Sequence, residues 1–107
     1  MGVEPSPAGY VELVNRVPPL ARLSCDYHAE WPLWLDNGGD PDGLGLTDGL
    51  ATDIKAWQHH FDAHFHWEHG WDTTTSRDWH ADNGRRLARS LEAEIGHNFR
   101  IELSPYA

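Results

Sequence analysis

Histidine is the residue type that offers most chemistry in this sequence. Eight histidines are present, and five of them fall between residues 59 and 69. At about 100° of rotation per residue, His60 and His64 lie one turn apart at the edge of one apolar helix face. Two imidazoles at this spacing can bind one metal ion, and His80 on the next helix is placed to supply a third ligand. The pattern therefore indicates a zinc site, or else boundary histidines that hydrogen-bond to backbone or to Asp53.

The motifs that would turn such a site into an enzyme are missing. The zincin pattern His-Glu-x-x-His fails because Phe61 follows His60, so no general base is built in. Hydrolase nucleophile elbows, phosphate-binding loops, dinucleotide fingerprints and dithiol motifs are absent as well. The single cysteine, Cys25, excludes an internal disulfide, and its inward position on a strand favours a core residue over a nucleophile. We predict no catalytic residues and rank a metal-binding protein or small metalloenzyme second.

A different constellation is an acidic segment that also carries tryptophan. The chain has 17 Asp and Glu against 8 Lys and Arg, a formal charge of −9. Residues 26–53 contain seven of these acids and no Lys or Arg. Carboxylates steer a basic protein toward such a surface, while buried tryptophan supplies binding energy. The candidate partner-binding residues are Trp31, Trp34, Asp36, Asp40, Asp42 and Asp48.

This charge distribution predicts an acidic protein-binding module whose partner is another, basic protein. Nucleic acid is disfavoured as a partner, because its phosphates would be repelled by the net negative charge. The alternative is that the two tryptophans cap the open end of a small core and the acids only solvate the loop.

The helices that position these residues can be predicted from hydrophobic spacing. An apolar stripe at helical period begins at the N-cap Thr47 and ends at Gly70, which predicts a helix of roughly six turns. A second helix follows Thr75, whose spacing to Asp78 resembles a capping box, and it stops at Gly96. The two stripes suit a helical hairpin.

The strands flank this hairpin. Residues 20–27 and 99–103 alternate between apolar and polar side chains, and opposite charges on their outer faces, such as Arg22 and Glu102, favour pairing. The order β-α-α-β predicts an α+β fold in which the hairpin covers a small sheet. We expect an antiparallel sheet, because two successive helices return the chain to its starting end. Gly84, on the inner face of the second helix, predicts close approach of the first helix or one of its tryptophans.

The chain divides into a flexible, proline-containing arm at residues 1–19 and a single α+β domain at residues 20–107. Its start lacks the basic and apolar stretches of a signal peptide, and no run of about 18 apolar residues exists. We therefore expect a cytoplasmic protein without membrane contact. Because a small sheet leaves its edges open, we also expect a homodimer, formed through a sheet edge or through exposed tryptophan.

Four short segments together resemble small actinobacterial proteins that have no known activity. These segments are WPLW at 31–34, AWQ at 56–58, GWD at 70–72 and GRRLA at 84–88. The resemblance covers roughly residues 20–103 and implies a single cytoplasmic domain, but it brings no known activity or cofactor. We predict no cofactor, with zinc as the alternative. Small acidic proteins of such genomes often resemble immunity proteins that neutralise toxins. By this analogy of size and charge, the protein-binding prediction takes the form of an immunity-like neutraliser of a basic partner.

Overall fold

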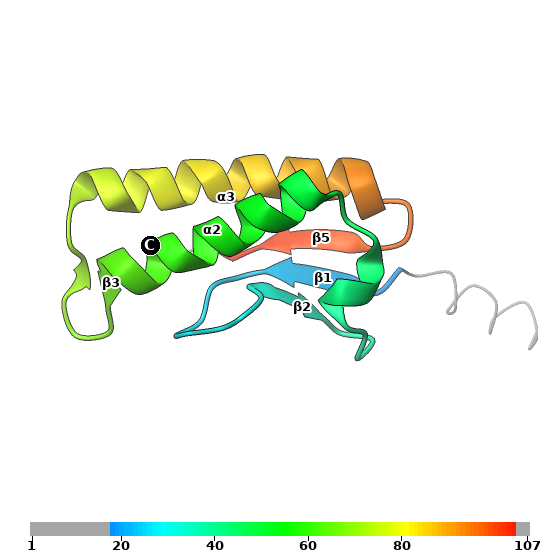
Figure 1. Ribbon diagram of the computed structural model, residues 1–107, viewed down its shortest axis with the longest axis horizontal. Helices are drawn as coiled ribbons and strands as arrows, with labels where there is room; N and C mark the ends of the chain where they lie inside the picture. Colours follow the sequence, from blue (N-terminus) through cyan, green and yellow to red (C-terminus); the bar gives the residue numbers. More distant parts are fainter. Residues whose placement is uncertain (1–17, 105–107) are drawn as a thin grey trace, which may run out of the picture.

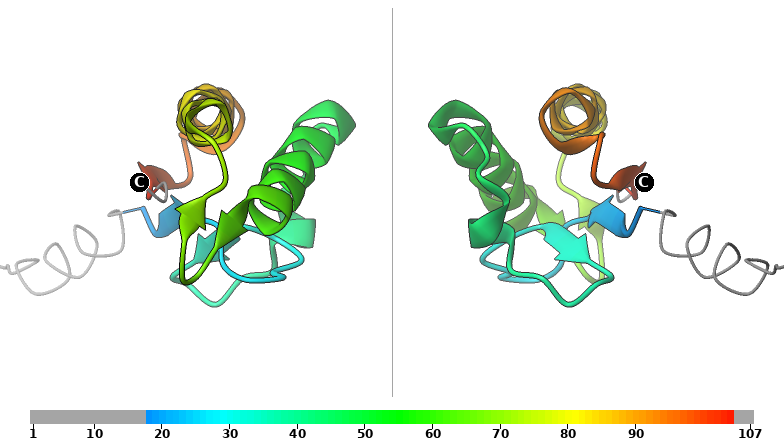
Figure 2. Two further views of the ribbon diagram at one scale, coloured as in Figure 1. Left: turned by 90° about the vertical axis from the view of Figure 1, so that its left-hand side faces the viewer. Right: turned by 90° about the vertical axis from the view of Figure 1, so that its right-hand side faces the viewer.

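A small mixed sheet beneath two long helices makes up this α+β protein (Figure 1). The computed structural model describes residues 18–104. The elements are β1 (Leu20–Leu23), β2 (Leu33–Leu35), the short 3-10 helix η1 (Pro41–Leu44), α2 (Asp48–His64), β3 (Phe65–His66), β4 (Gly70–Trp71), α3 (Thr74–Ile95) and β5 (Arg100–Leu103). The main sheet has the order β2-β1-β5, and both helices lie on one face of it (Figure 2). The predicted α+β fold, a helical hairpin on a small sheet, is confirmed.

Two further predictions can be compared with the structure only over the described residues. The arm predicted at residues 1–19 lies outside them except for its last two residues. Among the helices that the structure describes, none is long and apolar enough to cross a membrane.

The direction of β5 differs from the prediction. β1 pairs antiparallel with β2 but parallel with β5, so the expected antiparallel pairing of 20–27 with 99–103 is wrong. The reason is β2, a strand of three residues that the sequence analysis omits. Because β2 reverses the chain once more before α2, the helical hairpin returns the chain to the sheet in the direction of β1. The predicted strand 20–27 is also too long, since β1 ends at Leu23.

The two faces of the sheet differ as the alternation predicts. Ala21 and Leu23 are buried, while Arg22 is exposed and its Nε lies 2.8 Å from a carboxylate oxygen of Glu102. This ion pair is the predicted charge pair between the two strands. The strand register places Trp34 opposite Arg22 on β2. A row of tryptophan, arginine and glutamate therefore crosses the face of the sheet that the helices leave open (Figure 2).

Helix α2 begins where predicted and ends earlier. Thr47 is its N-cap, and the Thr47 hydroxyl accepts a hydrogen bond from the Leu50 amide at 3.4 Å. The helix ends at His64 because Phe65 adopts extended dihedral angles, φ −112° and ψ 131°, and starts the β3–β4 hairpin. Gly70 takes a left-handed φ of 74° in this hairpin instead of ending a helix. With 17 residues, α2 has fewer than five turns, so the predicted extension to Gly70 is wrong.

Helix α3 ends where predicted and begins earlier. Its N-cap is Thr73, whose hydroxyl accepts from the Ser76 amide at 2.9 Å. Thr75 already lies inside the helix, so the predicted capping box of Thr75 with Asp78 is wrong. The C-cap is Gly96, as the sequence predicts.

Gly84 lets the two helices approach closely around Trp57. A Cβ atom at Gly84 would lie 2.9 Å from Cζ2 of Trp57. The indole of Trp57 is fully buried, and its Nε1 donates to the backbone carbonyl of His80 at 2.8 Å. The Trp57 ring also stacks on the His80 ring, with centroids 4.4 Å apart and an interplanar angle of 8°. The predicted approach of a tryptophan to Gly84 is confirmed.

Candidate functional site

The acidic segment, residues 26–53, follows β1, forms the β2 edge of the sheet and leads into α2 (Figure 1, cyan to green). It turns at His28 (φ 55°), Gly38 (φ 78°) and Gly45 (φ 73°), all in the left-handed region. Asn, Asp and His tolerate this region better than most residues, and glycine adopts it without penalty. The glycine-rich and aspartate-rich composition thus sets the path of the segment, while β2 anchors it to the sheet.

Trp31 and Trp34 line one hollow beside β2, with a volume of about 380 Å³. Trp34 is 46% exposed, and its Nε1 donates to the Ser24 carbonyl at 2.8 Å. Trp31 is half-buried, and its Nε1 donates to the Asp42 carboxylate at 2.9 Å. The ammonium nitrogen of Lys55 lies 4.5 Å from the Trp31 ring centroid, so this ring already interacts with a cation of its own chain. Both indoles are held in place while part of their surface stays accessible.

Three of the predicted acidic contact residues also hold the segment in shape. Asp36 Oδ1 accepts from the Leu20 amide at 2.8 Å and ties the turn after β2 to the start of β1. Asp40 caps η1 by accepting from the Asp42 amide at 3.0 Å, and Asp42 accepts the indole bond described above. Asp48 lies in the first turn of α2, where a negative charge interacts favourably with the helix dipole. The first three contacts need an acceptor oxygen and not a charge.

Most of the acids in this segment form no ion pair with residues 18–104. Within residues 18–104, Asp53 is the acid of the segment that forms an ion pair, with Arg86 at 3.6 Å. The other six of its seven acids form none with the described residues. Like charges this close in sequence repel one another and create a negative field over the β2 edge.

The predicted metal ligands, His60, His64 and His80, have different surroundings. His60 Nε2 lies 2.9 Å from the carbonyl oxygen of Ser76, and His64 Nδ1 lies 2.7 Å from a carboxylate oxygen of Asp72. The rings of His60 and His64 are neighbours, with centroids 4.5 Å apart, whereas His80 is fully buried. Among the described residues, the three do not form a group whose ligand atoms all lie within 4.8 Å of one another. The backbone contact of His60 fits the alternative of a boundary histidine.

Burial moves the titration of two groups away from neutral pH. The pKa of His80 falls from 6.5 to about 4, because burial disfavours the charged ring and, to a smaller extent, because His60 repels it. Burial raises the pKa of the Cys25 thiol, and the charge of Asp62 adds to this effect. The thiol donates to the Trp57 carbonyl at 3.9 Å, and its predicted position in the core is confirmed. Both groups are therefore uncharged core residues at pH 7.

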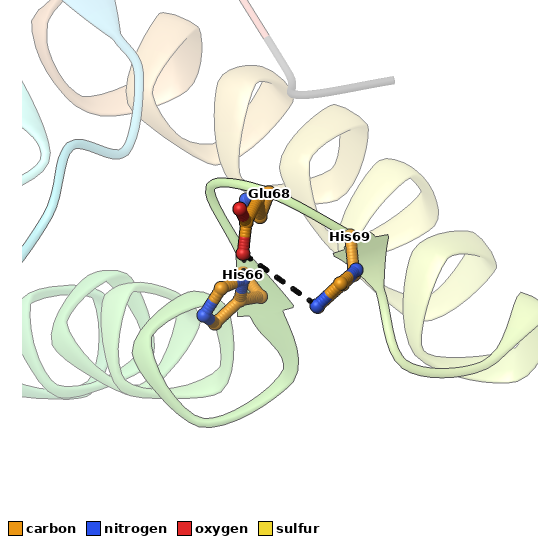
Figure 3. Close-up of side chains that lie close together, drawn as sticks. All are labelled: His66, Glu68 and His69. Carbon is orange, nitrogen blue, oxygen red and sulfur yellow. Dashed lines mark hydrogen bonds and ion pairs between the residues drawn. The ribbon is translucent and has the colours of Figure 1, made fainter.

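One cluster is missed by the sequence analysis. His66, Glu68 and His69 lie at the tip of the β3–β4 hairpin (Figure 3), and among the described residues they form a group whose ligand atoms lie within 4.8 Å of one another. A helix continued to Gly70 would place them on an exposed helical face. The spacing His-x-Glu-His directly before a glycine, typical of a turn, is the signal that could have revealed the cluster.

A family comparison bears directly on the predicted immunity-like role. The model of a family described as Serratia CdiI immunity protein-like matches residues 20–106. The chain belongs to this family. The match extends from β1 through β5, so it covers every strand and helix that the structure describes. No curated protein matches the chain.

Membership of the CdiI immunity-like family supports a protein-binding role, because CdiI immunity proteins bind a partner protein toxin. The prediction of an immunity-like protein with another protein as partner is confirmed in this general form. The resemblance to actinobacterial proteins stays a prediction.

Proposed function

We propose that this CdiI-like immunity protein neutralises a basic toxin by binding it through an acidic tryptophan surface. This surface consists of Trp31, Trp34, Asp36, Asp40, Asp42 and Asp48. The observation that carries the proposal is that two fixed indoles line one hollow in a segment whose carboxylates mostly lack ion-pair partners among residues 18–104.

The two residue types contribute in different ways. Carboxylates speed the encounter with a basic protein and disfavour acidic ones, an effect that weakens as salt screens the charges. Tryptophan supplies contact area and a ring face that attracts Lys or Arg, as the contact of Lys55 with Trp31 illustrates. Because hydrogen bonds already hold both indoles, little ordering is needed when the partner binds.

The salt dependence of binding separates two kinds of toxin. A nuclease toxin has cationic groups that hold phosphates, and the carboxylates of the surface would take the place of those phosphates. Its binding would then weaken steeply with salt. A toxin that acts on another substrate would depend more on the tryptophan contacts and less on salt.

The proposal is tested with the triple variant Asp36→Asn, Asp40→Asn and Asp42→Asn. Asparagine keeps an acceptor oxygen for each hydrogen bond while removing the charge. The matched control is the triple variant Asp78→Asn, Asp82→Asn and Glu92→Gln on α3, which changes the net charge equally at a different surface.

The partner is first co-purified with the tagged full-length chain from its native host and identified by mass spectrometry. Its affinity for each variant is then measured by calorimetry at low and at physiological salt. We expect the acidic-segment variant to bind about tenfold more weakly at low salt and the control to bind almost normally. Equal affinity of both variants and wild type at low salt would refute a role for these carboxylates.

The tryptophan contribution has its own test. Trp34→Ala should weaken partner binding by about 2 kcal/mol, a typical loss for a tryptophan at the centre of an interface. The control is Trp67→Ala, which removes the indole of the β3–β4 hairpin that is 70% exposed. A larger loss of affinity for Trp67→Ala than for Trp34→Ala would place the contact elsewhere.

A further inference from the structure

We propose that the tip of the β3–β4 hairpin binds one divalent transition-metal ion of the Zn²⁺ class through His66, Glu68 and His69. The ligand atoms of these residues lie within 4.8 Å of one another (Figure 3). Nε2 of His69 is 3.8 Å from Oε1 of Glu68. This site is distinct from the acidic tryptophan surface, and its occupation does not depend on a toxin partner.

The base of the hairpin holds the three ligands close together. The paired residues are Phe65 with Trp71 and His66 with Gly70. The rings of Phe65 and Trp71 meet edge to face with centroids 5.2 Å apart, and Phe65 also stacks on Phe61 of α2 at 5.0 Å. The left-handed φ of Gly70 closes the turn. A packed aromatic base therefore supports a short loop, which limits the chain entropy lost when an ion joins the ligands.

The donor set matches the ligand preference of zinc. Two imidazoles and one carboxylate are the three protein ligands of many zinc sites that keep one position open. Ligand atoms in a tetrahedral zinc site lie about 3.4 Å apart, given bonds of about 2.1 Å. The ligand atoms, within 4.8 Å of one another, must therefore approach by at most about 1.4 Å. The side chains of His69 and Glu68 are 78% and 57% exposed, so both can make this movement without disturbing the core.

The His66 ring already makes a hydrogen bond within the loop, and an ion at Nδ1 would compete with it. The Glu68 amide donates to His66 Nδ1 at 3.1 Å, so Nδ1 carries the lone pair in the neutral ring. An ion bound to Nδ1 would replace this hydrogen bond, and water would take over the exposed Glu68 amide.

Charge near the hairpin also favours a cation. A hollow of about 340 Å³ is lined by His66 and His69 together with Asp62, His64 and Asp72. Carboxylates therefore stand beside the site as well as within it, in a chain with a formal charge of −9. A divalent ion bound between two neutral imidazoles and Glu68 would offset part of this negative charge.

The test is titration of chelator-treated, full-length protein with ZnCl₂ by calorimetry, and with Co²⁺ by absorption spectroscopy. We expect one Zn²⁺ per chain, and intense visible Co²⁺ bands of the kind that four-coordinate sites produce. His69→Ala and Glu68→Gln should each lower the Zn²⁺ affinity at least tenfold. His59→Ala, which removes an exposed histidine from α2, is the matched control and should bind as wild type.

Three outcomes would overturn the proposal. The first is Zn²⁺ binding that is equal in wild type, His69→Ala and Glu68→Gln. The second is an equal loss in His59→Ala, which would indicate adventitious binding by surface imidazoles. The third is loss of the site in His60→Ala but not in His69→Ala, which would assign the ion to the histidines of α2 instead. Circular dichroism of each variant confirms that the fold is retained.

Discussion

The buried histidine of α3 gives this protein a defined sensitivity to mild acid. Burial lowers the pKa of His80 from 6.5 to about 4, so between these values the unfolded chain binds a proton that the folded chain excludes. The folded state therefore loses stability as pH falls through this window, while near pH 7 the contribution of His80 is almost fully present. From these two pKa values, the free energy of unfolding falls by about 2 kcal/mol between pH 7 and pH 5 because of His80 alone.

Urea denaturation followed by tryptophan fluorescence at both pH values measures this loss. His80→Phe keeps an aromatic ring against Trp57 but cannot titrate, so its free energy of unfolding should fall about 2 kcal/mol less than that of wild type. His80→Leu serves the same purpose if the larger ring disturbs packing, and His59→Gln, at an exposed position, should behave as wild type. An equal pH dependence in wild type and His80→Phe would refute the reasoning. An NMR titration that places the pKa of the His80 imidazole near 6.5 would refute it as well.

Other positions should respond in ways set by their contacts. Gly84→Ala should lower the free energy of unfolding by about 1–3 kcal/mol, because its Cβ would lie 2.9 Å from Trp57 Cζ2; a gain of stability in urea denaturation would contradict this contact. Thr47→Ala should cost about 1–2 kcal/mol in thermal melts, since Thr47 caps α2 and donates to Glu94 through its amide at 2.9 Å and its hydroxyl at 2.7 Å; unchanged stability would exclude that role. The Cys25 thiol is 2% exposed and has a raised pKa, so it should react with a disulfide reagent only as fast as the protein opens; rapid labelling of the native protein would show the thiol to be accessible.

The elements that could be predicted are those with a long hydrophobic period. The stripes of α2 and α3 run over several turns, and their caps at Thr47 and Gly96 agree with the structure. β2, β3 and β4 have only two or three residues each, which is too short for an alternation to be recognised. Because β2 was not predicted, one reversal of the chain was left out of the predicted topology. This omission alone inverted the predicted direction of β5.

Residue roles could be predicted where one physical reason dominates. A glycine in the middle of a buried helix face has few explanations besides close packing, and a Cβ at Gly84 would indeed lie too close to Trp57. The surroundings of the histidines depend instead on tertiary geometry. His60 and His64 keep their helical spacing, but the direction of His80 follows from its stacking on a tryptophan. The hairpin that brings His66 next to His69 depends on where α2 ends, which the helical period did not reveal.

In the acidic segment, the hydrogen-bonding role of aspartate can be distinguished from the effect of its negative charge. Asp36, Asp40 and Asp42 contribute acceptor oxygens to the architecture, and asparagine supplies the same oxygen. Their negative charges form no ion pair with residues 18–104 and repel neighbouring carboxylates, which lowers the stability of the folded state. The triple asparagine variant should therefore unfold at an equal or higher temperature than wild type while binding a basic partner more weakly. Calorimetry of the free protein and of the complex measures both quantities, and a clear drop in melting temperature would mean that the charges serve the fold and not a partner.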